Sequence, residues 1–127
     1  MPNVVVIMLG TNDARINTYR YSEDFESNYK QLIKEFQALS SNPQVYLAKP
    51  PPIFNNSLNL SGENLANGVI PRIDHVAYEL SLPTIDVYAA LLNHPEYFPD
   101  GVHPNNEGAS LIAKVIYDNI QIVNNQR

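Results

Sequence analysis

The order of apolar and polar positions along the chain predicts strands that alternate with helices. A continuous, mostly β-branched apolar run at 4–9, a second stretch at 44–49 and a short one at 83–88 are predicted to form strands. Between these runs, apolar residues recur three or four positions apart, which places them on one face of a helix. The pattern is that of an α/β protein with a parallel sheet.

Three longer helices are predicted from the same spacing. The first begins near Ser22, an N-cap residue followed by two acidic side chains. The second covers roughly 64–80, and Pro71 must kink it or mark its true start, because a proline in a helix interior costs about 3 kcal/mol. The last begins after a cap at Asn105 or Asn106 and continues towards the end of the sequence.

The complete pattern predicts one domain over 1–127 with three parallel strands, helices between them and a short helical turn ending near Leu92. The strand at 4–9 is apolar without alternation, so we expect both of its faces to be buried. A chain of 127 residues is long enough to form a hydrophobic core without disulfides or metals.

Composition excludes several classes of function. The formal net charge is -5 and the 8 Lys and Arg residues form no cluster, which argues against nucleic acid or an anionic membrane as partner. The absence of cysteine excludes disulfides and thiolate metal sites. No apolar run is long enough to form a transmembrane segment.

The strongest candidate chemistry lies in the stretch 97–105, where Asp100 and His103 flank Gly101 and Pro104 follows. Such a loop can bring the carboxylate to the imidazole Nδ1–H and leave Nε2 free, as in a nucleophile-activating relay. Tyr97 and Phe98 would anchor the loop by packing. The alternative is a turn residue beside a surface histidine, since Asp-x-x-His is common by chance.

A second candidate, Gly10-Thr11-Asn12-Asp13, follows the first strand. In open α/β sheets, ligands bind at the carboxyl ends of the strands. There the Asn12 amide and neighbouring backbone N–H groups could donate to a developing oxyanion, and one such donor is worth about 2.7–4 kcal/mol of barrier. The alternative is a polar turn in which Asn12 or Asp13 caps a local backbone amide.

Together and in this order, the two stretches resemble the SGNH hydrolases, also called the GDSL family of serine esterases and lipases. Residues 10–13 match the family's Gly-x-Asn-Asp block, and residues 100–104 match its Asp-x-x-His-Pro block. The resemblance implies a three-layer flavodoxin-like fold, truncated here to about three parallel strands flanked by helices. It covers the sequence from the family's third strand to its final helix.

The resemblance also implies roles for individual residues. Asn12 would be the oxyanion donor, His103 the general base and Asp100 the group that orients it. The substrate would be a small acyl ester, with acetylated carbohydrate, lipid and thioester all compatible, and no cofactor or metal is implied. Further substrate-binding candidates are Gly10, Thr11, Asp13 and Arg15.

The family's Gly-Asp-Ser nucleophile block has no counterpart in the 127 residues. Of the eight serines, Ser57 and Ser61 lie in a loop that could approach the site; the others are Ser22, Ser27, Ser40, Ser41, Ser81 and Ser110. The sequence therefore predicts the C-terminal part of an ester hydrolase, with little or no activity alone. A non-catalytic binding module and one half of a split esterase are the alternatives.

Three further expectations follow. The strand at 4–9 would lie at an apolar sheet edge and favour a homo-oligomer. His75 and His94 are expected to be partly exposed and non-catalytic. A metal site at Asp13, Asp100 and His103 is disfavoured, because their spacing matches no common ligand motif.

Overall fold

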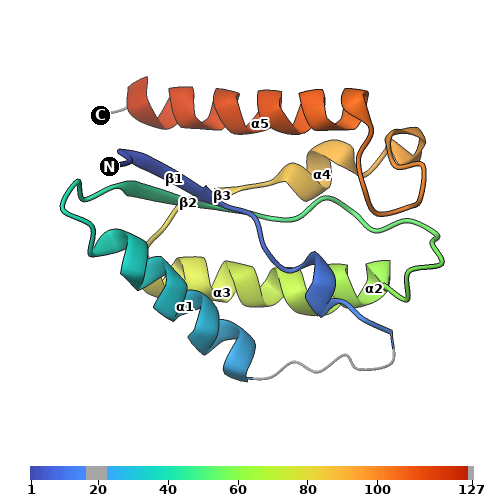
Figure 1. The fold of residues 1–127 in the computed structure, drawn as a ribbon, viewed down its shortest axis with the longest axis horizontal. Coiled ribbons are helices and arrows are strands. Elements are labelled where there is room, and N and C mark those ends of the chain that lie inside the picture. Colours follow the sequence, from blue (N-terminus) through green and yellow to red (C-terminus); the bar gives the residue numbers. More distant parts are fainter. Residues whose placement is uncertain (17–22, 126–127) are drawn as a thin grey trace.

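The computed structural model describes residues 1–16 and 23–125 and places three parallel strands between two helical layers (Figure 1). The strands lie in the order β1-β2-β3, with bounds Val4–Ile7, Gln44–Ala48 and Thr84–Ile85. The helical elements are η1 (Thr11–Asp13), α1 (Glu23–Gln37), α2 (Gly62–Asn64), η2 (Leu65–Val69), α3 (Ile70–Leu80), α4 (Val87–Leu91), η3 (Pro95–Tyr97) and α5 (Asn106–Asn125). The predicted α/β fold with a parallel sheet is confirmed.

The core has two parts, one on each face of the sheet. Along β2, Val45 and Leu47 join the apolar cluster that α1 and α3 cover, whereas Tyr46 and Ala48 join the cluster beneath α4 and α5 (Figure 1). Successive side chains of a strand point to opposite faces, so one fully buried strand can serve both clusters. Both faces of the sheet therefore pack against helices, and this packing holds the ends of the strands in place.

The first strand is shorter and more exposed than the sequence predicts. It ends at Ile7, and Val4, Met8 and Leu9 are 38%, 37% and 47% exposed. The expectation that both faces of a strand at 4–9 are buried is therefore wrong. The reason is that β1 is an edge strand with β2 as its neighbour, and the chain leaves the sheet beyond Ile7.

The second predicted helix begins earlier and is not uniform. It starts at Gly62, where the Ser61 hydroxyl accepts a hydrogen bond from the Asn64 N–H at 3.0 Å, and it continues without a break to Leu80. Pro71 lies in the first turn of α3, directly after the π-helical turns of η2. A wider π turn accommodates the hydrogen bond that proline cannot donate.

Helix caps set the remaining boundaries. The predicted strand at 83–88 contains only two strand residues, because the Asp86 side chain accepts the Ala89 N–H at 2.9 Å and starts α4. Asn105 caps α5 by accepting the Gly108 N–H at 2.9 Å, as expected. The predicted cap Ser22 lies outside the described residues. Within the described residues, no helix combines the length and apolar character needed to span a bilayer.

Candidate active site

Asp100 and His103 form a closed turn. One oxygen of the Asp100 carboxylate, Oδ2, lies 2.6 Å from Nδ1 of His103. The other, Oδ1, accepts the backbone N–H groups of Val102 at 2.8 Å and His103 at 2.7 Å. Gly101 allows the backbone to form this turn, because its φ of 87° is a conformation that residues with a Cβ rarely adopt.

These hydrogen bonds hold the carboxylate in its ionised form. The pKa of Asp100 is lowered to about 2, first by the backbone N–H of His103, then by its imidazole and by the backbone N–H of Val102. The ring is thus oriented through Nδ1. The His103 side chain is 74% exposed, and Nε2 has no hydrogen-bond partner among the described residues.

The turn is anchored on the core from both sides. Phe98 is buried and its ring lies 5.3 Å from that of Phe54, while Tyr97 packs against the same apolar cluster. The Tyr97 carbonyl accepts the N–H of Asn105, the cap of α5, at 2.8 Å. The expectation that Tyr97 and Phe98 anchor this loop by packing is confirmed.

Gly10-Thr11-Asn12-Asp13 leaves the edge strand and turns at once into η1. Gly10 has a φ of 127°, and a Cβ there would lie 2.7 Å from a methyl group of Val69. The Asp13 N–H donates to the Gly10 carbonyl at 3.0 Å. Asn12 and Asp13 are exposed, and among the described residues their side chains cap no backbone amide. The Asn12 amide is therefore available as a donor.

A hollow of about 410 Å³ opens beside this turn, between the end of β1 and α1. Burial at its rim raises the pKa of Asp13, against the opposing charge of Arg15. Arg15 itself is exposed and is held through its backbone, in an antiparallel bridge with Leu60. The hollow is lined by Met8, Leu9, Gly10, Thr11, Asn12, Asp13, Phe25, Asn28, Tyr29 and Leu32.

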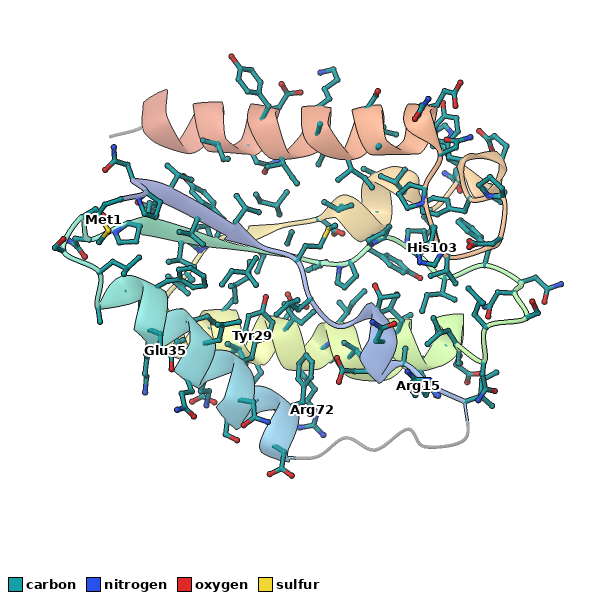
Figure 2. The ribbon with its side chains drawn as sticks, viewed as in Figure 1. Met1, Arg15, Tyr29, Glu35, Arg72 and His103 are labelled. Carbon is teal, nitrogen blue, oxygen red and sulfur yellow. The ribbon has the colours of Figure 1, made fainter. Side chains whose placement is uncertain are left out.

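The two motifs lie at the same end of the sheet, because each is hydrogen-bonded to the segment that follows β2. The Phe54 N–H donates to the Gly101 carbonyl at 2.8 Å, and the Ile16 N–H donates to the Asn59 carbonyl at 3.0 Å. Figure 2 shows His103 and Arg15 at the same end of the molecule, towards which the strands run. The fold thus gathers residues 10–15 and 100–103 at the carboxyl edge of the sheet.

Each of the three histidines pairs with a carboxylate. Nδ1 of His94 lies 2.9 Å from Glu96 on an exposed turn, and His75 contacts Glu26 and Glu79. Both histidines are partly exposed, as expected, at 36% and 55% of their side chains. Of the three, only His103 belongs to the turn in which the Gly101 carbonyl accepts the Phe54 N–H of the segment after β2.

Glu26, His75 and Glu79 are the one group of potential metal ligands among the described residues, with ligand atoms within 4.8 Å of one another. Each ring nitrogen of His75 already faces a carboxylate oxygen. Arg72 binds Glu26 at 3.0 Å and Lys30 binds Glu79 at 2.7 Å. The group therefore acts as an ion-pair network between α1 and α3. Sequence patterns missed it because Glu26 lies 49 positions from His75 in the chain.

Neither candidate serine of the loop reaches the histidine among the described contacts. The Ser61 hydroxyl is engaged in capping α2, and Ser57 is exposed on the loop surface. A nucleophilic serine would form a hydrogen bond with the base or lie close to it. The structure therefore gives neither serine the position of a nucleophile.

The parallel α/β sheet thus presents an aspartate–histidine pair and an available asparagine amide at one edge. The chain belongs to the GDSL-like lipase/acylhydrolase family, whose sequence profile matches residues 1–111. An acetylxylan esterase from Xylanibacter ruminicola is 32% identical over 133 residues, covering 91% of this chain and 28% of that protein.

Solved structures agree with this assignment. A GDSL-like lipase from Bacteroides thetaiotaomicron is 26% identical with a TM-score of 0.75, covering 96% of this chain and 63% of that one. A lipase/acylhydrolase from Enterococcus faecalis is 27% identical with a TM-score of 0.74, covering 94% and 61%. The chain therefore spans less than two thirds of the length of these relatives.

Proposed function

We propose that residues 1–127 supply the base and the oxyanion donor of an SGNH-type ester hydrolase. The observation that carries the proposal is the 2.6 Å contact between Asp100 Oδ2 and His103 Nδ1, with Nε2 facing away from its partner. The Gly10–Asp13 turn at the same edge of the sheet, with the Asn12 amide available, supports it. The nucleophilic serine comes from outside these residues.

In this mechanism, Nε2 of His103 removes the proton of the serine hydroxyl as its oxygen attacks the ester carbonyl carbon. The Asn12 amide donates to the oxyanion of the tetrahedral intermediate, and Asp100 stabilises the imidazolium. Collapse transfers the proton to the leaving alcohol and gives an acyl-enzyme. Water, deprotonated by His103, then releases the carboxylic acid and restores the serine.

For the substrate we propose a small acyl ester, most specifically an acetylated carbohydrate. The similarity to an acetylxylan esterase supports this choice. Gly10, Thr11 and Asp13 line the hollow beside Asn12 and would contact the substrate, with Arg15 exposed at its margin. An acetyl group is small, so much of the recognition would fall to polar contacts with the alcohol part.

We further propose that the 127 residues alone have little or no esterase activity, because they contain no Gly-Asp-Ser block. Members of a catalytic triad act as a unit, and loss of one leaves only a residual rate. The test is turnover of 4-nitrophenyl acetate by the pure protein, which should not exceed that of the His103→Ala variant. Robust turnover that His103→Ala abolishes would contradict this proposal.

The edge of β1 is the proposed site of homo-oligomer formation. An edge strand presents unpaired backbone groups, and apolar side chains are exposed at Val4 within it and at Met8 and Leu9 just beyond it. Light scattering should show association that Val4→Lys weakens, because Val4 lies in β1 and is 38% exposed. Leu58→Lys is the matched control, since Leu58 is 43% exposed and lies in a loop outside the sheet. A monomeric protein at high concentration would contradict association through the edge of β1.

A non-catalytic binding module is the second candidate, favoured by the combination of a hollow beside Asn12 and the missing nucleophile block. The two candidates differ in what they require of Asp100. A module that binds ligand in the hollow should keep its affinity for acetylated xylo-oligosaccharide in Asp100→Asn. An ester hydrolase completed by an added Gly-Asp-Ser segment should lose turnover in the same variant.

A further inference from the structure

The loop at 53–61 contacts both candidate catalytic turns. Near its start, the Phe54 N–H donates to the Gly101 carbonyl at 2.8 Å. The approach is close: a Cβ on Gly101 would lie 2.2 Å from the Asn55 carbonyl oxygen. This end of the loop therefore fixes the position of the Asp100–His103 turn.

The other end of the loop holds the chain just after Asn12. The Ser61 N–H donates to the Ala14 carbonyl at 2.8 Å, and the Asn59 carbonyl accepts the Ile16 N–H at 3.0 Å. These bonds surround the antiparallel bridge between Arg15 and Leu60. Because Ala14 directly follows η1, this end of the loop fixes the turn that carries Asn12.

The side chain of Asn56 joins the two ends. Its Nδ2 donates to the Phe54 carbonyl at 2.8 Å and to the Leu60 carbonyl at 3.0 Å. Its Oδ1 accepts the Leu58 N–H at 2.8 Å and the Leu60 N–H at 3.4 Å. Phe54 is the residue that binds Gly101, and Leu60 is the residue that pairs with Arg15.

The chemistry of this position requires a primary amide. Two backbone carbonyls need two donors, and two backbone N–H groups need an acceptor, which an asparagine side chain supplies together. A carboxylate of the same shape would place an oxygen against the carbonyls of Phe54 and Leu60. A hydroxyl offers a single donor and is too short to reach both sides.

We propose that Asn56 is a positioning residue for the ester-hydrolase site, because it ties the end of the 53–61 loop that contacts the Asp100–His103 turn to the end that holds the segment after Asn12. This role rests on the function proposed above. Asn56 does not contact the reacting groups; it sets the separation between the base and the oxyanion donor. Catalysis by positioned groups is sensitive to displacements of about 1 Å.

The test compares Asn56→Ala with Asn55→Ala in the 127-residue protein. Asn55 is exposed, and its side chain makes no hydrogen bond among the described residues, so it is a matched control. Asn56→Ala should accelerate amide exchange at both Phe54 and Ile16 by about tenfold, the effect of one weakened hydrogen bond. It should also raise the pKa of Asp100 from about 2 towards 3.8, read by carboxyl ¹³C NMR.

Equal exchange rates and equal Asp100 titrations in the two variants would overturn the proposal. If Asn56→Ala fails to fold, Asn56→Asp keeps the shape and the acceptor, and the same changes are expected of it. Unchanged values in a folded Asn56→Asp overturn the proposal equally.

A kinetic comparison separates this proposal from the function on which it rests. In protein completed with a Gly-Asp-Ser segment, Asn56→Ala should lower kcat by about tenfold or more with little change in KM. A change in KM alone would contradict the positioning role. Amide exchange could change in Asn56→Ala while the wild type with an added Gly-Asp-Ser segment shows no ester turnover. That result would support the link through Asn56 and refute the ester-hydrolase function.

Discussion

The Asp100–His103 turn and the Gly10–Asp13 turn differ in how completely the chain builds them. In the first, one carboxylate accepts three hydrogen bonds, and a buried phenylalanine and a helix cap hold the turn from either side. In the second, the polar side chains point outward beside an open hollow at the sheet edge. The hydrogen bonds that orient the base are local to residues 100–103, whereas the oxyanion turn borders a strand edge that other residues can complete.

Replacing the glycine of each turn should give the largest effects and separate the two regions. Gly101→Ala would place a Cβ 2.2 Å from a backbone oxygen at a φ of 87°, and we expect a loss of about 3 kcal/mol of unfolding free energy. Gly10→Ala meets a methyl group at 2.7 Å, which can move, so about 1–2 kcal/mol is expected. Urea unfolding measures both; a larger loss at Gly10 would contradict this ranking.

The pH dependence of stability should carry the signature of the closed turn. The pKa of Asp100 is about 2 in the folded protein, below its unfolded value. Its contribution to stability is therefore present above the unfolded pKa and is lost as the pH falls from about 4 to about 2. Asp100→Asn should be less stable than wild type at neutral pH, with a smaller loss over this window. If the unfolding free energies of wild type and Asp100→Asn, measured with urea, have the same pH dependence, the hydrogen-bonded Asp100 turn is refuted.

In the Gly10–Asp13 turn, the pH dependence of stability should have the opposite sign, and the effect on stability should be the smallest. Partial burial raises the pKa of Asp13 above its unfolded value, so stability from this group is present below the unfolded pKa and is lost as the pH rises through the folded one. Asp13→Asn should therefore stabilise the protein slightly at neutral pH, by no more than about 0.5 kcal/mol. Destabilisation of the size seen in Asp100→Asn would contradict the contrast between the turns.

The fold was predictable from sequence where periodicity decides the structure. The apolar runs and the helical spacing gave three parallel strands and the helices between them, since burial on a sheet or on one helix face imposes those periods. The failures were local. The exposure of Met8 and Leu9 follows from the end of β1 at Ile7, where the chain leaves the sheet, and the end of β3 depends on a single cap at Asp86.

The candidate site was predictable where its contacts are local in sequence. Asp100 and His103 lie three residues apart, so turn chemistry allowed their pairing, and the second block at 10–13 favoured it over a chance spacing. The role of Asn56 could not be predicted, because its hydrogen bonds matter only once Phe54 lies beside Gly101 and Leu60 beside Arg15. Those contacts are long-range and arise from the packing of three loops.

The most direct test of the account is ester turnover after a Gly-Asp-Ser segment from a family member is added or fused to the chain. His94→Ala is the matched control for His103→Ala, because His94 is also a surface histidine paired with a carboxylate. We expect turnover of 4-nitrophenyl acetate that falls by about 10³-fold or more in His103→Ala and is retained in His94→Ala. Restored turnover that is indifferent to His103 would contradict it.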